Sequence, residues 1–193
     1  MIEGPEVFIL AKAIKVLGFQ VESYGKHLLI KDWKTGICYD ISFGLAGKIK
    51  INPDMSIQKI IDPTIPSGYM KKINSFAEGK ANLGIDWMTS SKEDLKNVIL
   101  SWGRRKKKMS ALLIDQHELA GIGSVWADAI FKHCHISGDT KANLFDCLSL
   151  NEKFLDAVVG VRDNIKKRYI HFLSTYKVNI KFINNINFQQ TQD

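Results

Sequence analysis

The first residues of the chain combine groups that could act together as an amine-based active site. Glu3 and Glu6 follow closely on the N-terminal amine, and Lys26 stands in the glycine turn of "SYGKHLL". An α-amine titrates near pH ~7.7 to 8.0 and a lysine near ~10.4, so the terminus is the larger source of neutral, nucleophilic amine. As purely structural residues, the two acids would stabilise a helix start and Lys26 would be a strand-edge lysine.

A second group of residues is suited to holding phosphate. Gly121, Gly123 and Ser124 directly precede a helical pattern, where uncovered backbone N–H groups and the partial charge of a helix start favour anions. The basic run shortly upstream comprises Arg104, Arg105, Lys106, Lys107 and Lys108. A glycine-containing turn and a solvated basic face would explain each feature separately. Together they favour nucleic acid as the partner.

The composition of the 193-residue chain is that of a folded protein with a basic surface. Hydrophobic residues make up 45%, enough for a buried core, and the net charge of +7 suits a phosphate-rich partner. The three cysteines form no CxxC pair, so neither a disulfide framework nor a cysteine zinc site is expected. Neither a membrane span nor a signal peptide is indicated. We expect a soluble intracellular protein, in the cytoplasm, nucleoid or nucleus, without metal or cofactor.

The elements that must position these groups begin with a helix. From residue 5 to residue 17 apolar side chains recur at helical spacing, Pro5 suits the first turn and Gly18 suits the stop. Alternating or apolar runs between breakers then predict short antiparallel strands at 19–24, 26–32, 37–43 and 48–52. Residues 53–68 carry three prolines and are typical of a linker. Residues 1–66 are therefore predicted to form a small helix-and-sheet domain.

The second half is predicted to be helical. Ser90 and Glu93 have the spacing of a capping box in front of a helix. Further helices are predicted within 106–115 and from Ser124 onward, separated by a glycine-punctuated turn, and a long amphipathic helix follows over 151–173. The prediction is a helical domain over 67–176. The tail, 177–193, alternates like a short hairpin or frays.

Four motifs in this order make the chain resemble the formamidopyrimidine-DNA glycosylase and endonuclease VIII family. They are "IEGPE" at 2–6, "YGKHLLI" at 24–30, "FGLAGKIKI" at 43–51 and "LLIDQHELAGIGSVWADAIF" at 112–131. "LLIDQ" and the leucine of "GLAG" are closer to the endonuclease VIII branch. The resemblance implies an α+β fold, in which a reduced N-terminal β-sandwich with an N-terminal helix precedes an all-helical helix-two-turns-helix domain. It also implies binding to duplex DNA with a damaged base or an abasic site, or to single-stranded DNA. We expect a monomer.

The family's chemistry is base excision with abasic-site (AP) lyase cleavage: an oxidised base is flipped out and an amine attacks C1′ of the sugar. Carried over to this sequence, the resemblance implies the terminal amine, on Met1 or Ile2, as nucleophile and Glu3 as proton shuttle. Glu6 would assist at the helix start, and Lys26 would contact the phosphate beside the damaged nucleotide. Leu45 would fill the gap left by the flipped base. The other implied DNA contacts are Lys48, Arg104, Arg105, Lys108, Gly121, Gly123 and Ser124.

Three departures from the family pattern leave alternatives. Position 2 is Ile2 where the family exposes a proline amine, and a bulky second residue generally resists removal of Met1. The cysteines of the family's C-terminal zinc finger are missing, and the sheet region is shorter than in full-length relatives. The main alternative is a paralogue that binds damaged or single-stranded DNA without cleaving it. A ribosome- or RNA-binding module is a third, because helix-two-turns-helix segments also occur in ribosomal proteins.

Overall fold

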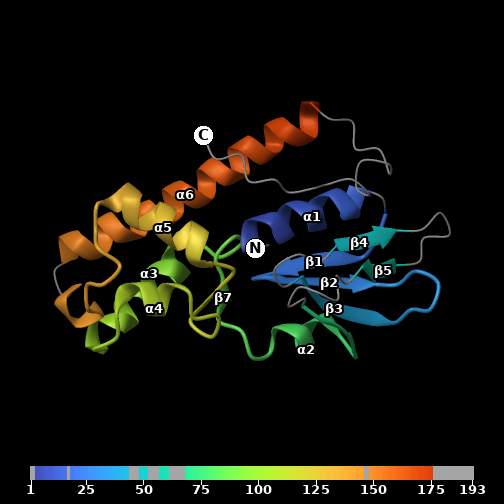
Figure 1. The fold of residues 1–193 in the computed structure, drawn as a ribbon, viewed down its shortest axis with the longest axis horizontal. Coiled ribbons are helices and arrows are strands. Elements are labelled where there is room, and N and C mark those ends of the chain that lie inside the picture. Colours follow the sequence, from blue (N-terminus) through green and yellow to red (C-terminus); the bar gives the residue numbers. More distant parts are fainter. Residues whose placement is uncertain are drawn as a thin grey trace.

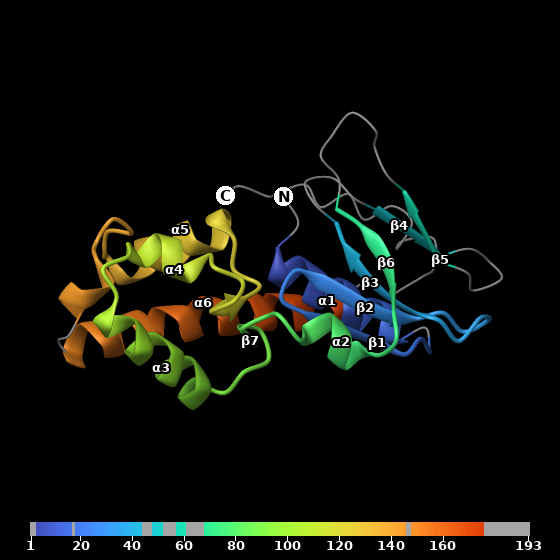
Figure 2. The ribbon, with the colours of Figure 1, turned by 90° about the horizontal axis from the view of Figure 1, so that it is seen from below.

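The computed structural model describes residues 3–16, 18–43, 48–51, 57–60, 68–145 and 148–175. An N-terminal helix and antiparallel strands form one half and a group of helices forms the other (Figure 1), so the predicted α+β class is confirmed. The long helix α6 (Leu148–Thr175) runs from the helical half to α1 (Gly4–Val16), which it contacts (Figures 1 and 2). The predicted tail lies outside the described residues.

The first half is built on a four-stranded antiparallel sheet with the order β1-β2-β3-β6. These strands are β1 (Val21–Tyr24), β2 (His27–Lys31), β3 (Cys38–Ser42) and β6 (Met70–Ile73). Helix α1 packs its apolar stripe, including Val7 and Ile14, against one face of the sheet, where Leu28, Ile30 and Ile41 are buried. Because side chains alternate along a strand, His27, Leu29 and Asp40 lie on the opposite face.

Two predictions about the middle of the chain are wrong. Residues 57–60 form β5 (Ile57–Ile60), which pairs with β4 (Lys48–Ile51), within the stretch that the prolines had marked as a linker. Residues 70–73 are strand rather than helix and pair with β3, so the sheet of the first half extends past the predicted boundary at residue 67. Both segments are strands because they pair with a neighbouring strand. Four residues are too few for their own sequence to show a clear strand periodicity.

The predicted helices of the second half occur in the predicted order, as α3 (Lys92–Ser101), α4 (Met109–Leu113), α5 (Ser124–Cys134) and α6. The structure adds η1 (Trp102–Arg104), η2 (Ala142–Phe145) and the pair of short strands β7 (Ile85–Asp86) and β8 (Leu119–Ala120), and α2 (Phe76–Lys80) packs against β2, β3 and β6 of the sheet half. The capping box of α3 is formed by Ser91 and Asp94, one residue later than predicted. The start of α5 at Ser124 is as predicted.

Each half has its own hydrophobic core. The larger one surrounds Trp87, Trp102 and Phe154 in the helical half, and Phe8 of α1 packs against it from the other half. The second lies between α1 and the sheet. None of the described helices combines the length and apolar character of a membrane span. The contact of α1 with both cores fixes the N-terminal segment at the boundary between the two halves.

Candidate functional site

Three glycines from three separate sequence motifs meet at this boundary. The backbone N–H of Gly4 donates to the carbonyl of Gly121 at 2.8 Å. A Cβ atom on Gly4 would lie 2.6 Å from that carbonyl oxygen, and one on Gly25 would lie 2.8 Å from Cβ of Ala120. Gly121 itself has φ +106°, a conformation that residues with a side chain rarely adopt. Only glycine lets "IEGPE", "YGKHLLI" and "ELAGIGS" approach this closely.

The turn that carries Lys26 is fixed on both sides. Gly25 has φ +57° and Lys26 does not have positive φ, which fits a two-residue hairpin with glycine at the first central position. The Tyr24 hydroxyl donates to the carbonyl of Gly84 at 3.0 Å, and the N–H of Gly25 donates to the Asp86 carboxylate at 3.2 Å. Both partners precede α3, so the Lys26 turn is attached to the helical half.

The Glu3 carboxylate lies at the N-terminal end of α5. It accepts hydrogen bonds from the backbone N–H groups of Gly123 at 3.0 Å, Val125 at 3.4 Å and Trp126 at 3.4 Å, and the residue is only 1% exposed. These are N–H groups that a helix leaves without internal partners, and the helix dipole stabilises a negative charge there. A Cβ on Gly123 would lie 2.0 Å from a Glu3 oxygen. Glycine at 123 therefore makes the space that Glu3 occupies.

This arrangement changes the expected role of the glycine turn. We expected Gly121, Gly123 and Ser124 to hold a phosphate at the helix start, but the N–H of Gly123 and two of the next three N–H groups serve Glu3. Ser124, the first residue of α5, is exposed at the surface. A phosphate at this helix start would therefore contact Ser124, while Glu3 is the anion held by α5.

Glu6 and Lys26 adjoin the buried Glu3. Glu6 accepts from the backbone N–H of Glu3 at 3.1 Å and from the indole N–H of Trp126 at 3.5 Å. Burial raises the pKa of Glu6, although these hydrogen bonds oppose the shift. Burial also lowers the pKa of Lys26, and the nearby charges of Glu3 and Glu6 partly offset this effect. The structure therefore brings together three of the predicted residues, Glu3, Glu6 and Lys26.

Asp86 and Gln116 support this junction and were not predicted from the sequence. The buried Asp86 carboxylate accepts from the N–H groups of Gly25 and Met88 and from the Thr89 hydroxyl, the last at 2.7 Å. Burial raises the pKa of Asp86 against these bonds. The Gln116 amide accepts from the N–H of Gly121 at 2.9 Å and donates to the carbonyl of Ile122 at 2.8 Å. In the sequence, the one feature that could have indicated a role for Asp86 is that it is the single acid among the apolar residues of "LGIDWM".

The basic run divides into paired and unpaired residues. Arg105 forms an ion pair with Glu118, which also accepts from the indole N–H of Trp102, and Lys108 pairs with Asp139 at 2.7 Å. The other basic residues of the run are Arg104, Lys106 and Lys107. They are exposed and form no ion pair within the part of the chain that the structure describes. These three residues are the cations of the run that are available to a partner. Among them, only Arg104 was predicted to contact DNA.

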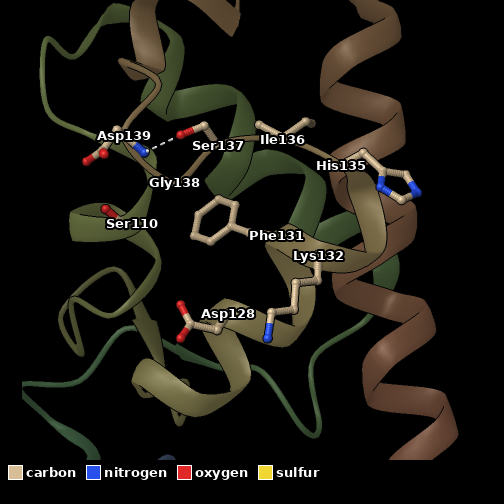
Figure 3. Close-up of a pocket in the computed structure, with 9 residues that line it drawn as sticks. All are labelled: Ser110, Asp128, Phe131, Lys132, His135, Ile136, Ser137, Gly138 and Asp139. Carbon is tan, nitrogen blue, oxygen red and sulfur yellow. Dashed lines mark hydrogen bonds between the residues drawn. The ribbon is translucent and has the colours of Figure 1, made fainter.

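The remaining predicted site residues are not placed. Met1, Ile2 and Leu45 lie outside the described residues, and only the backbone of Lys48 is described, at the start of β4. A hollow of about 830 Å³ lies between α4 and the C-terminal part of α5, with Phe131 at its centre and Asp128 and Lys132 beside it (Figure 3). None of the predicted site residues lines this hollow. The candidate site is therefore the junction of Glu3, Glu6 and Lys26.

Comparison with known proteins identifies the fold. No family model and no curated protein matches the sequence. The chain superposes on the MutM (Fpg) protein from Thermus thermophilus with a TM-score of 0.65 at 16% identity, over 86% of this chain and 76% of that one. It superposes equally well on Lactococcus lactis Fpg in a complex with abasic-site DNA, with a TM-score of 0.65 at 14% identity over 85% and 78% of the two chains.

A further match is the Lactococcus lactis Fpg (MutM) complex with DNA containing N7-benzyl-Fapy-dG, with a TM-score of 0.65, 14% identity, and coverage of 85% of this chain and 79% of that one. At such low identities the likeness concerns the fold. The chain has the fold of Fpg proteins, with the predicted order of an N-terminal β domain and a helical domain.

Proposed function

We propose that this protein is a DNA-repair glycosylase and AP lyase of the formamidopyrimidine-DNA glycosylase and endonuclease VIII family. The observation that supports this proposal is that the N-terminal, Lys26 and α5 motifs meet at one buried junction. The fold that holds this junction is shared with Fpg proteins whose structures contain damaged or abasic DNA. The endonuclease VIII branch and oxidised bases as substrates are part of the proposal. DNA would lie across the boundary between the sheet half and the helical half.

In the proposed reaction the terminal amine attacks C1′ of the damaged nucleotide. The N–C1′ bond forms as the C1′–base bond breaks, and the base leaves with the bonding electrons and takes a proton from water. The Glu3 carboxylate takes a proton from the attached amine and returns it to the ring oxygen as the C1′–O bond opens to the Schiff base; elimination then removes a proton from C2′ and breaks the adjacent C–O bond to phosphate. Lys26, whose pKa is lowered by burial, is the second amine of the site and a phosphate contact.

One observation favours a binding protein without cleavage as the second candidate. Position 2 is isoleucine where the resemblance implies a proline amine, and with Met1 retained the amine would be displaced by one residue from Glu3. The buried junction would then serve only to orient the two halves on DNA.

Borohydride trapping on duplex DNA with a single abasic site separates the two candidates. We expect a covalent cross-link that peptide mapping places at residue 1 or 2, with a yield strongly reduced in Glu3→Gln. A cross-link at Lys26 would assign the nucleophile to that lysine. Tight binding without any cross-link would overturn the lyase and support the binding protein, and absence of specific binding would overturn both.

The exposed members of the basic run should carry the salt dependence of DNA binding. We expect that replacing Arg104, Lys106 and Lys107 by glutamine lowers the slope of log K against log salt by up to about 0.9 for each phosphate that the protein no longer neutralises. Replacing Arg105 and Lys108, which already have carboxylate partners, should change the slope much less. Affinity measured by fluorescence anisotropy over a salt series gives both slopes. A wild-type slope in the triple variant would show that Arg104, Lys106 and Lys107 do not contact DNA.

A further inference from the structure

A cluster of polar side chains that the proposed reaction does not use lies next to Lys26. His27 begins β2 immediately after the Lys26 turn, and its Nδ1 lies 2.9 Å from an oxygen of Asp40 on β3. The Tyr69 hydroxyl donates to the other Asp40 oxygen at 3.1 Å, and the Lys71 amine lies 3.3 Å from that same oxygen. This cluster lies on the sheet face opposite α1, at the end of the sheet that adjoins the helical half.

Asp40 determines which nitrogen of His27 is free. Asp40 is only 1% exposed, and although burial favours its neutral form, hydrogen bonds from His27, Tyr69 and Lys71 and the charge of His27 hold its pKa below the usual range. An ionised carboxylate only accepts hydrogen bonds, so the proton on the His27 ring is at Nδ1. Nε2 makes no hydrogen bond to any residue that the structure describes, and the His27 side chain is 17% exposed.

The surroundings of His27 are suited to an anion. The charged or titratable groups that face it are Asp40 on β3, Tyr69 just before β6, Lys71 on β6, Tyr24 opposite on β1, and the adjacent Lys26. Asp40 is buried with its oxygens already occupied, and Glu22, further along the same face of β1, is paired with Lys80 of α2. Lys71 is 55% exposed and lies over the Tyr69 ring, 5.4 Å from its centroid. A doubly protonated His27 would pair with Asp40 through Nδ1, and within the described residues nothing would accept from its Nε2–H.

We propose that His27 is a DNA-backbone contact in which Asp40 and Tyr69 hold the ring and protonated Nε2 donates to a phosphate oxygen next to the one that Lys26 contacts. This inference rests on the proposed DNA-binding function. The contact needs both ring protons, because Asp40 already accepts from Nδ1–H and the phosphate would accept from Nε2–H. The merely structural alternative is that His27 serves only to connect β2, β3 and β6 through Asp40.

The substitution His27→Asn separates the two roles. An asparagine amide nitrogen occupies nearly the position of Nδ1 and still donates to Asp40, but nothing replaces Nε2. Against a duplex carrying a tetrahydrofuran abasic-site analogue, we expect His27→Asn to weaken binding about tenfold at pH 6 and to lower the salt slope by about one. The matched variant Lys26→Gln should also weaken binding, because it removes the neighbouring phosphate contact.

Several results would overturn the inference. If His27→Asn keeps the wild-type melting temperature, affinity and salt slope at pH 6, His27 is structural and the proposed function stands. If the wild-type protein does not bind the abasic duplex, the inference and the proposed function fail together. If His27→Asn does not fold, the contact is tested in the wild-type protein by recording the NMR signals of the His27 ring nitrogens with and without DNA. DNA should shift Nε2 at pH 6, and an unshifted signal would overturn the contact.

Discussion

Replacing Gly123 by alanine is expected to reduce lyase activity by at least about a hundredfold, because it removes Glu3 from its position. The new Cβ would lie 2.0 Å from one Glu3 oxygen and 2.2 Å from the carboxyl carbon, so the carboxylate must leave. The N–H groups of Gly123, Val125 and Trp126 would lose their acceptor at a buried site. The expected loss of stability is about 2 to 4 kcal/mol. Single-turnover cleavage and urea unfolding measure the two effects.

A double-mutant cycle tests whether Glu3 is the cause. In a Glu3→Ala background the carboxylate is already missing, so Gly123→Ala should have little further effect on stability or cleavage. Gly160→Ala on α6 is the matched control, since its nearest neighbour is His133 at 3.7 Å and a helical alanine should stabilise by about 0.5 to 1 kcal/mol. A Gly123→Ala protein as active as wild type would show that Glu3 does not need this position.

Replacing Gly4 by alanine is expected to separate the N-terminal segment from the helical half. Its Cβ would lie between 2.6 and 2.9 Å from three backbone atoms of Gly121, which no change of side-chain rotamer relieves. The hydrogen bond from Gly4 to Gly121 would break, and α1, which directly follows Glu3 and contacts both cores, would shift. We expect a loss of about 3 kcal/mol in the free energy of unfolding and the disappearance of the borohydride cross-link.

Urea unfolding and the cross-link yield distinguish a local from a global effect of Gly4→Ala. The unfolding curve should shift to lower urea while far-ultraviolet circular dichroism at low urea stays that of the wild type. A variant that unfolds like the wild type and still cross-links would contradict the tight junction of Gly4 with Gly121. Affinity for abasic DNA in the same protein reports whether the two halves still bind together.

The sequence predicted those parts of the fold that depend on local patterns. The helix after Pro5, the start of α5 at Ser124 and the long α6 follow from apolar spacing and terminal residues, which need no knowledge of distant partners. The capping box was displaced by one residue, because Ser90 and Ser91 both precede an acid at the right spacing. Strands β5 and β6 were missed, since their pairing with β4 and β3 stabilises them more than their own residues do.

By itself, the sequence determined the candidate chemistry: an amine near Glu3 and Glu6, a lysine in a glycine turn, and a glycine turn before a helix, in the order of a known family. Only the tertiary structure decided how these groups are used. Glu3, and not a phosphate, accepts from the N–H groups at the start of α5, and Arg105 and Lys108 form ion pairs with acids. Asp86 and Asp40 contact Gly25 and His27, the residues on either side of Lys26. The physical reason is that helix ends, ion pairs and buried carboxylates are satisfied by whatever lies nearest in space, and residues up to 123 positions apart meet here.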